Sequence, residues 1–444
     1  MPQWEFSRLE AIYEHIVFLL LGPPAFTKQG DIPLPISVKP IHMKFSVLLP
    51  TRNRLDLLSY AIETVRKQDY DNWELIVSDN CSEQDVEGYV RSLGDERIKY
   101  FRTGTFVPVT DNWNNALKNS DGDYVIMLGD DDCLLRGYFS TLKEVIEKYK
   151  SPDLIYTSAL LYAYPGVLPD NPDGFLRSYS LSGIFRSAKS PFWLDRNDAV
   201  SLAESSVNFR IRFDFNMQFS LISRKLINEM VKYGDFFQSP YPDYYASNAM
   251  MLKAERILIV PTPLVTIGIS PKSFGYFYFN DAERAGNQFL QNIPDPALAS
   301  RLESVVLPGT DMNTSWLVSM ETLTQNFGRE SPLPVNYKRY RYLQIAAVYS
   351  GLILHKSGAI VSLQELRRKM SLAERLFYDF PLTLISIISS ILPARYRGLF
   401  ANAVIRSTGS HPAHASPSID GKFKTILDVF EQVSPDGTNT FLKP

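Results

Sequence analysis

Clusters of polar residues follow short apolar runs in the first third of the chain. Pro50–Arg54 (PTRNR) follows Phe45–Leu49, Asp130–Asp132 follow Tyr124–Leu128, and Asp79 ends a third apolar run. Each run has the length and composition of a buried strand. Three consecutive aspartates repel one another unless a cation lies between them, and carboxylates suit Mg²⁺ or Mn²⁺, usually shared with substrate phosphates. The pattern favours a metal-assisted site over the alternative of a polar loop in which Asp caps the next helix.

Composition excludes several other kinds of chemistry. The chain has 444 residues, and its 46 Lys and Arg nearly balance its 48 Asp and Glu, which is unlike a nucleic-acid-binding protein. No histidine lies between His42 and His355, so a His-dependent triad or an H-E-x-x-H zinc site is excluded there. Cys81 and Cys133 are the only cysteines, too few for a disulfide framework. Neither G-x-G-x-x-G nor a P-loop is present, which disfavours dehydrogenases and P-loop enzymes.

Strand-like and helix-like segments alternate from residue 45 to about residue 162. For example, Leu55, Leu58, Ala61, Ile62 and Val65 recur at helical spacing between the first two strand-like runs. Short connections between alternating strands and helices predict an α/β fold, a parallel sheet with helices on both faces. Because such sheets bind ligands beyond the carboxyl ends of their strands, the polar clusters are expected to line one crevice. Residues 164–197, rich in Pro, Gly and Ser, are expected to form an insertion or long loop.

Four separated motifs resemble a known family. FSVLLPTRNR, ELIVSDNCSEQD, and the stretch from DNWNNALKNSDGDY to VIMLGDDDCLLRGY occur in the order and spacing of family 2 glycosyltransferases. The resemblance is close over about residues 44–165 and looser to about residue 280. It implies the GT-A fold, a Rossmann-like nucleotide-diphospho-sugar transferase domain, and an inverting enzyme that uses a nucleotide-sugar donor, typically a UDP-sugar.

The resemblance also implies roles for individual positions. Pro50 and Thr51 would hold the base and ribose of the nucleotide, while Asn53 and Arg54 would shape their loop. The aspartates would divide the remaining contacts with the donor: Asp79 would bind the base, Asp130 would approach the ribose or the metal, Asp131 would ligate Mg²⁺ or Mn²⁺, and Asp132 would flank it. In the family this last motif is often D-x-D-D, whereas here Gly129 stands in place of the first Asp.

An inverting transferase needs a carboxylate that deprotonates the acceptor hydroxyl. In the family this base stands just before a helix, and Asp243 matches that position, with Asp235 and Asp214 as reserve candidates. The alternative for Asp243 is the N-cap of the helix that begins at Tyr244. Lys272, in a loop after the last expected strand, either neutralises the leaving diphosphate or is a solvated surface lysine.

The rest of the chain is divided on composition. We expect an N-terminal helical extension and linker (1–43), a GT-A domain (44–285), a mostly helical C-terminal region (286–406), and a linker and tail (407–444). From Glu330 to Arg406 the sequence has 11 Lys or Arg and 4 Asp or Glu. This basic region, which includes Lys338, Arg339, Arg341, Arg367, Arg368 and Lys369, either contacts an anionic membrane or forms the solvated faces of helices.

No apolar run is long enough to span a bilayer. The candidates are Ile16–Leu21, which lacks a basic region before it, and Pro381–Leu392, which suits a buried or interfacial helix. The sequence favours a cytoplasmic location and leaves open a peripheral contact with the inner face of a membrane. We expect a nucleotide-sugar donor and a saccharide or lipid-linked acceptor, in polysaccharide, O-antigen or glycolipid biosynthesis. The alternatives are a nucleotidyltransferase-like enzyme and a non-catalytic GT-A-like binding protein.

Overall fold

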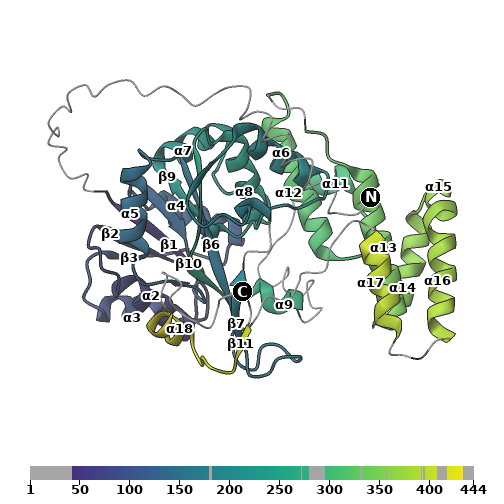
Figure 1. Cartoon of the computed structure of the whole chain (residues 1–444), viewed down its shortest axis with the longest axis horizontal. Coiled ribbons are helices and arrows are strands. Elements are labelled where there is room, and N and C mark those ends of the chain that lie inside the picture. The colour runs from purple at the N-terminus through teal and green to yellow at the C-terminus, as the bar shows by residue number, and fades with distance from the viewer. Residues whose placement is uncertain are drawn as a thin grey trace, which may run out of the picture. The chain divides into compact units, whose positions relative to one another are not determined.

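The computed structural model describes most of the chain after residue 42 (Figure 1). The described residues are 43–179, 183–271, 273–279, 296–330, 333–356, 358–391, 393, 396–407 and 418–433. The expected N-terminal helical extension and Lys272 therefore lie outside the described residues.

One mixed sheet organises the described residues from 43 to 271. Its strand order is β11-β7-β6-β9-β4-β1-β2-β3. The bounds are β1 Phe45–Thr51, β2 Trp73–Asp79, β3 Ile98–Arg102, β4 Tyr124–Met127, β6 Leu154–Ala163, β7 Phe175–Tyr179, β9 Ser220–Ser223 and β11 Ser418–Asp420. The expected parallel order is confirmed for β3, β2, β1 and β4, but β9 runs antiparallel to both β4 and β6. The α/β class is therefore confirmed, with a mixed rather than wholly parallel sheet.

Helices lie on either side of this sheet (Figure 1). Those of the first half are α2 Leu55–Arg66, α3 Val86–Ser92, α4 Val109–Lys118 and α5 Tyr138–Lys148. The apolar face predicted for α2 is confirmed, because Leu58, Ala61, Ile62 and Val65 are all fully buried. Burial of such a face supplies most of the stability of a helix in a protein. The helix in turn fixes the loop that leads into it from β1.

The second half of the sheet domain closes the carboxyl edge of the sheet. It contains α6 Arg196–Val207, α7 Arg224–Met230, α8 Pro242–Lys253, the long strand β10 Ile257–Ile269 and α9 Phe274–Phe279. Two strands were expected where β10 is found, and the irregular register around Pro263 accounts for the break in pattern. β10 pairs with β6, β5 (Cys133–Leu134) and β8 (Phe192–Leu194). Residues 164–197 are not only a loop, because they include β7 and β8.

The C-terminal region is helical, as expected. Its helices are α11 Pro296–Leu302, α12 Asp311–Phe327, α13 Tyr337–Ile353, α14 Ala359–Lys369, α15 Leu372–Glu374, the π-helical turn η4 Arg375–Asp379, α16 Phe380–Ile391 and α17 Arg397–Ser407. α12 packs on α8, and α13 packs on α14, α16 and α17 around a second apolar core. None of the described helices has the length and apolar character needed to cross a membrane.

The last described segment returns to the sheet. β11 pairs antiparallel with β7, and α18 (Ile426–Gln432) packs on α2. The expected short helix near the C-terminus is thus found, whereas its attachment to the sheet edge was not foreseen.

Candidate active site

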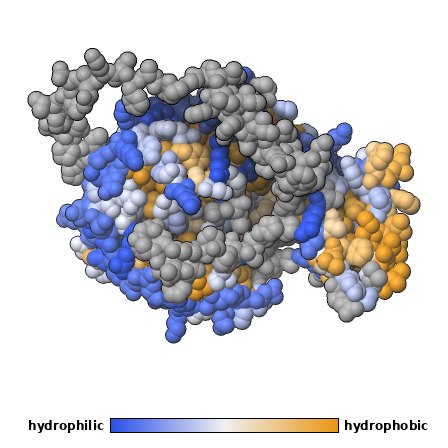
Figure 2. All heavy atoms as spheres, in the orientation of Figure 1, coloured by the Kyte–Doolittle hydropathy of each residue, from blue (hydrophilic) through white to orange (hydrophobic). Residues whose placement is uncertain are grey.

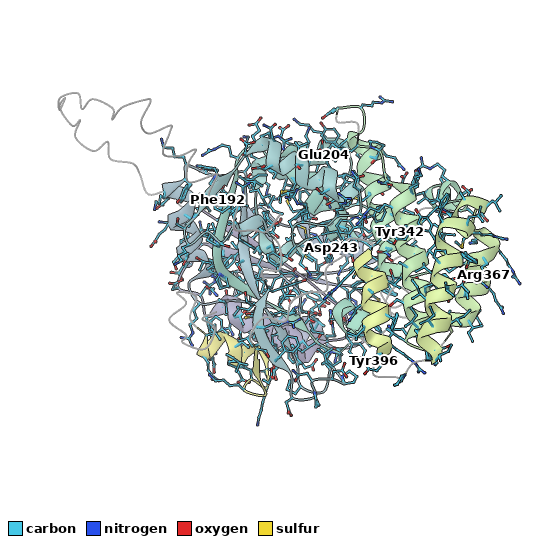
Figure 3. The ribbon with its side chains drawn as sticks, turned by 45° about the vertical axis from the view of Figure 1, so that its right-hand side comes forward. Phe192, Glu204, Asp243, Tyr342, Arg367 and Tyr396 are labelled. Carbon is cyan, nitrogen blue, oxygen red and sulfur yellow. The ribbon has the colours of Figure 1, made fainter. Side chains whose placement is uncertain are left out.

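A cavity of about 570 Å³ lies at the carboxyl ends of β1 and β4, between the sheet, α8 and α12. The predicted residues that line it are Pro50, Thr51, Arg54, Asp130, Asp131, Asp132 and Asp243. Asn53 and Asp79 do not line it. The sheet therefore brings together residues from the loops after β1 and β4, as the sequence predicted. Asp243, at the start of α8, lines the same cavity (Figure 3).

Asn53 shapes the loop after β1. Its φ of 53° places it in the left-handed region, which Asn tolerates better than most residues. Its backbone N–H donates to Ser82 Oγ at 2.9 Å, and its Oδ1 accepts from the backbone N–H of Glu83 at 2.7 Å. This residue ties the loop after β1 to the loop after β2, so the following Arg54 is aimed at the aspartates.

Arg54 lies among the three aspartates. Its Nη2 is 2.5 Å from Asp130 Oδ1, and its Nη1 is 3.8 Å from Asp131 Oδ2. Thr51 Oγ1 donates to the other oxygen of Asp130 at 2.7 Å. Although burial disfavours charge on Arg54, the neighbouring Asp130, Asp131 and Asp132 raise its pKa. The chain thus supplies a positive charge of its own to the acidic cluster.

Asp132 holds the loop together. Its Oδ2 accepts from the Gly129 N–H at 2.8 Å and from Gln218 Nε2 at 2.6 Å, and its Oδ1 accepts from the Gly268 N–H at 2.8 Å. A Cβ on Gly129 would lie 2.6 Å from Asp132 Oδ2, so an Asp could not replace Gly129 without moving this carboxylate. A side chain at position 129 would therefore disturb the hydrogen bonds that Asp132 makes.

Of the three aspartates, Asp131 makes the fewest close contacts with other polar groups of the chain. Its Oδ2 accepts from Ser270 Oγ at 2.5 Å, and no hydrogen bond from another described residue reaches Oδ1. The described residues contain no group of three His, Cys, Asp or Glu side chains ready to hold a metal ion. Mg²⁺ is commonly bound by one or two carboxylates together with substrate phosphates and water. The donor set therefore fits a cation held by Asp131 and a bound diphosphate, rather than by an all-protein cage.

Asp243 lies in the first turn of α8 and lines the same cavity as the acidic loop. The N-cap of this helix is Tyr241, so Asp243 is not the N-cap that the alternative interpretation expected. Burial raises the pKa of Asp243 to about 7, although the backbone N–H of Tyr244 donates to its Oδ1 at 3.0 Å and opposes the shift. A carboxylate with a pKa near the working pH is suited to general base catalysis.

Aromatic rings surround the start of α8 and account for this desolvation. Tyr244 stacks on Tyr241 with 5.5 Å between ring centroids, and it also contacts Phe215 at 4.6 Å and Trp316 at 4.9 Å. Trp316 comes from α12, so the helical C-terminal region contributes to the environment of Asp243. The reserve candidates Asp214 and Asp235 do not line the cavity.

Asp79 is fully buried at the end of β2. Its Oδ1 accepts from the Ser82 N–H at 2.9 Å, and its Oδ2 accepts from Tyr100 Oη at 2.7 Å and lies 3.3 Å from Arg102 Nη1. The neighbouring Asn80 lines the cavity instead. Binding of a base by Asp79 stays a prediction, and it would require one of these contacts to be exchanged.

Sequence reasoning missed Arg177. This residue lies on β7 and lines the cavity, where its guanidinium is 4.5 Å from the centroid of the Phe175 ring. No carboxylate of the described residues is among the groups that shift its pKa, which burial lowers. A desolvated cation without a carboxylate is suited to binding an anion. The only signal in the sequence was an isolated Arg in an apolar run, within a segment expected to be a loop.

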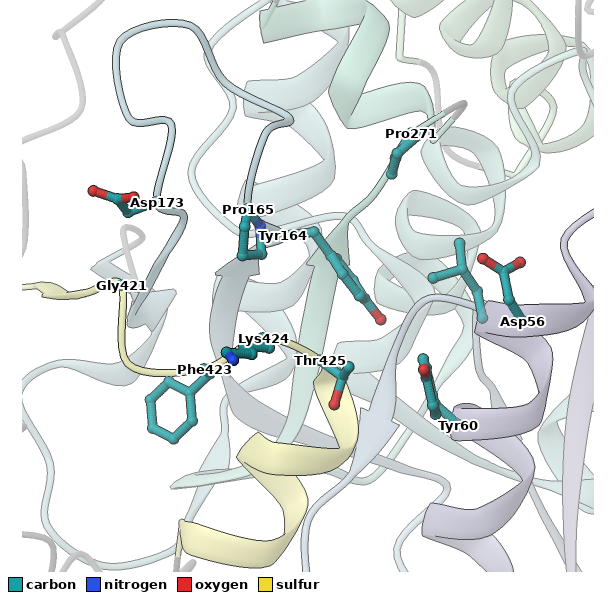
Figure 4. A pocket seen from close by; sticks show the side chains of 11 residues that line it. Asp56, Tyr60, Tyr164, Pro165, Asp173, Pro271, Gly421, Phe423, Lys424 and Thr425 are labelled. Atoms are coloured by element: carbon teal, nitrogen blue, oxygen red, sulfur yellow. The ribbon is translucent and has the colours of Figure 1, made fainter.

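A second hollow, of about 750 Å³, lies beside the end of β6 (Figure 4). Tyr60 of α2, Tyr164 and Thr425 line it, together with Asp56 and Lys424. The Tyr164 hydroxyl is buried and has no hydrogen-bond partner among the described residues. This hollow exists because the chain returns to the sheet before α18, and it contains none of the predicted site residues.

Comparison with known proteins identifies the family of the first part of the sheet. Residues 46–170 match the family model described as "Glycosyl transferase family 2". The resemblance predicted from the motifs is thereby confirmed for the segment that carries Pro50–Arg54 and Asp130–Asp132. Asp243, Arg177 and the helical region lie beyond this match.

Curated relatives agree over the same part of the chain. The "GalNAc(5)-diNAcBac-PP-undecaprenol beta-1,3-glucosyltransferase" of Campylobacter jejuni is 42% identical over 104 residues, which cover 23% of this chain and 34% of that protein. The "UDP-Glc:alpha-D-GlcNAc-diphosphoundecaprenol beta-1,3-glucosyltransferase WfgD" of Escherichia coli is 33% identical over 87 residues, which cover 20% of this chain and 34% of that protein. The chain thus spans about a third of the length of each of these relatives.

A solved structure to which this chain is similar is that of S. aureus TarS 1–349. It is 17% identical and aligns with a TM-score of 0.41, over 74% of this chain and 90% of that chain.

Proposed function

We propose that this chain is a glycosyltransferase that moves a sugar from a UDP-sugar to an acceptor hydroxyl, with inversion at the anomeric carbon. The observation that carries the proposal is that Asp131, on the family 2 segment, and Asp243, on α8, line one cavity. One side of such a cavity would hold the donor diphosphate, and the other would hold the attacking hydroxyl. Residues 44–285 would form the transferase domain, and residues 286–406 its helical companion.

The donor would lie against the ends of β1, β2 and β4. Asn80 and Phe106 line this part of the cavity beside Pro50 and Thr51, and they would contact the base and ribose. Arg54 Nη1 is buried and without a hydrogen bond among the described residues, so it is available to donate to a phosphate oxygen. Arg177 would provide a second cation for the diphosphate, which is one of the two roles that the sequence left open for Lys272.

Asp131 would hold the Mg²⁺ or Mn²⁺ that the family implies, in company with the donor diphosphate. When bound, such a cation neutralises charge on the departing diphosphate. The chain's own contribution is to keep Asp131 in place through Ser270 and to hold the loop through the three hydrogen bonds to Asp132. Arg54 balances part of the acidic charge before any ligand binds.

The transfer itself needs one base and one leaving group. The acceptor hydroxyl oxygen would attack the anomeric carbon, its proton would pass to Asp243, and the bond from the anomeric carbon to the diphosphate oxygen would break with its electron pair on the nucleoside diphosphate. Because burial raises the pKa of Asp243 to about 7, about half of this carboxyl group is ionised at neutral pH, and the ionised form becomes protonated during the reaction. Aromatic side chains around α8 would exclude water from the attacking face.

The relatives suggest the class of acceptor. Both relatives are named for glucosyl transfer to a saccharide on undecaprenol diphosphate, and one name includes UDP-Glc as the donor. We therefore propose a lipid-linked saccharide as the acceptor, in polysaccharide, O-antigen or glycolipid assembly. Such an acceptor would bring the enzyme to a membrane surface as a peripheral protein.

The test combines binding and turnover. UDP titrated into the full chain should bind with Mn²⁺ and lose affinity in EDTA, and Asp131→Asn should abolish the metal-dependent part. Donor hydrolysis, measured as UDP release across a panel of UDP-sugars, should fall by about 10²-fold or more in Asp243→Asn but not in the matched control Asp235→Asn. Absence of binding to any nucleoside diphosphate would overturn the donor site, and binding without release from any donor would indicate a binding protein.

A further inference from the structure

Large apolar side chains form one exposed line along η4 and α16. Leu376, Phe377, Phe380, Leu384, Ile387 and Ile391 are between 53% and 79% exposed, and we call them the apolar stripe. Their spacing of three or four residues, with one adjacent pair, places them on one side of a continuous helix. Figure 2 shows hydrophobic atoms gathered over the helical C-terminal region, whereas the rest of the described surface in that view is mainly hydrophilic.

The opposite side of the same helix is packed. Leu382 of α16 is buried in the second apolar core with Tyr349 and Ile353 of α13. Tyr349 Oη shares hydrogen bonds with Asp379 and with Thr383 Oγ1, and Arg367 Nε donates to Asp379 Oδ1 at 2.9 Å. These contacts fix which side of α16 faces outward, so the exposure of the apolar stripe is set by packing.

The π-helical turn η4 keeps this line continuous across Pro381. A proline inside an α-helix lacks an N–H and collides with the carbonyl four residues earlier, whereas a π-helical turn opens the backbone there. η4 ends two residues before Pro381, and the helix then continues as α16. The apolar residues before and after Pro381 are thus held on one rod.

The helical segment that carries the apolar stripe is rich in basic residues. Residues 359–407 contain seven Lys or Arg and three Asp or Glu, and residues 380–407 contain no acidic residue. The acids are internally paired: Glu374 binds Arg341 at 2.6 and 2.8 Å, Asp379 binds Arg367, and Glu365 lies 3.7 Å from Lys369. Arg368 and Arg406 are exposed and have no ion pair within the described residues. Some of the basic residues expected to contact a membrane are thus held in ion pairs within the chain, whereas others, such as Arg368, are not.

We propose that the apolar stripe docks in the headgroup region of an anionic lipid bilayer, with η4 and α16 lying parallel to the membrane plane. Helices that lie in an interface combine a large apolar face with basic residues beside it. Each basic residue near an anionic surface adds to the attraction. The docking is independent of what the cavity binds.

The charge distribution favours a lipid surface over a second copy of the chain. Two copies joined through this face would bring together two basic helical regions, and residues 380–407 contain no acidic residue that could pair with them. The stripe also follows one helical rod, and none of the described helices is long and apolar enough to cross a membrane. A contiguous exposed apolar patch of this kind marks an interaction site on most proteins.

Flotation with vesicles tests the proposal on the full chain. Wild type should float with vesicles of phosphatidylcholine and phosphatidylglycerol and bind phosphatidylcholine alone less well. Phe377→Ser combined with Phe380→Ser and Ile387→Ser should weaken partitioning by about tenfold or more, because three exposed apolar side chains no longer enter the interface. Arg368→Gln with Arg406→Gln should weaken binding to the anionic vesicles by about tenfold and leave binding to phosphatidylcholine unchanged.

Matched controls separate docking from misfolding. Ile211→Ser and Val231→Ser each remove a 45% exposed apolar residue of the sheet domain and should leave flotation unchanged. Because the stripe residues are exposed, the triple variant should keep the wild-type melting temperature and its affinity for UDP. The proposal is overturned if wild type does not float, if the triple variant floats like wild type, or if sedimentation shows a wild-type dimer that the triple variant alone dissociates.

Discussion

Arg54 Nη2 lies 2.5 Å from Asp130 Oδ1, and this buried ion pair joins the loop after β1 to the loop after β4. The Asp130 side chain is fully buried, and Thr51 donates to its second oxygen. The two loops belong to adjacent parallel strands, so the pair is a direct consequence of strand order. It gives the acidic loop a fixed shape and a partial balance of charge before a substrate arrives.

Removal of this arginine should therefore destabilise the fold and strengthen cation binding. Arg54→Ala leaves Asp130 buried without its partner, which typically costs about 3–5 kcal/mol. Denaturant unfolding should show the loss, and added Mg²⁺ should restore more stability to the variant than to wild type. Arg54→Lys, which keeps the positive charge without the forked guanidinium, should lose less stability than Arg54→Ala. Equal stability of Arg54→Ala and wild type would contradict this account.

The pH dependence of transfer should follow Asp243. Burial raises the pKa of Asp243 to about 7, and only the ionised form can accept the hydroxyl proton. The rate should rise with pH up to about 7 and then level off, and Asp243→Asn should remove this limb together with about 10²–10⁴-fold of the rate. Initial rates between pH 5 and pH 9 would measure it. If the pH–rate profile of Asp243→Asn were the same as that of wild type, another residue would be the base.

The same pKa predicts an effect on stability. A carboxyl group whose pKa is raised by folding stabilises the native state below its unfolded pKa, near 3.8, and that stability is lost as the pH rises through about 7. Asp243→Asn should therefore gain stability over wild type between pH 5 and pH 8, by about 1–2 kcal/mol, because the half-buried side chain keeps some contact with water. Melting temperatures of both proteins at these two pH values test the sign. A gain that shrinks toward pH 8 would contradict it.

The local order of strands and loops was predictable from the sequence. Apolar runs ended by polar residues placed Pro50–Arg54 and Asp130–Asp132 at one edge of the sheet, because parallel strands present their carboxyl ends together. Asp243 was found through its place before a helix. These predictions depended on residues near one another in the chain and on the family motifs.

Contacts between distant segments were not predictable. Asp132 accepts from the Gly268 N–H across 136 residues, and this bond makes it a structural part of the loop. Asp79 is directed inward because Tyr100 and Arg102 of the neighbouring strand bind its carboxylate. Arg177 reaches the cavity because β7 joins the sheet edge and pairs with β11 from the far end of the sequence. The spacing of apolar residues along the chain gives no information on such contacts between distant segments.

Gly268 should tolerate no side chain. A Cβ at this position would lie 2.0 Å from the carbonyl oxygen of Asp131, a backbone atom that cannot rotate away. Gly268→Ala should therefore displace the acidic loop, lower stability by about 1–3 kcal/mol and weaken UDP binding. Gly104→Ala is the matched control, since nothing lies within 4 Å of its Cβ. Calorimetric titration and thermal unfolding would measure both variants, and full UDP affinity in Gly268→Ala would show that the loop accommodates the methyl group.

Arg177 should bind the diphosphate of the donor. Arg177 lines the cavity, its guanidinium lies over the Phe175 ring, and it has no acidic partner among the described residues, so a phosphate group would supply the missing countercharge. Hydrogen bonds to charged groups contribute about 1.5–3 kcal/mol. Arg177→Gln should accordingly weaken UDP binding by about tenfold or more and leave uridine binding unchanged, because uridine lacks the diphosphate. The exposed Arg212→Gln is the matched control. Equal losses for UDP and uridine would show that Arg177 supports the cavity wall instead of contacting the phosphates.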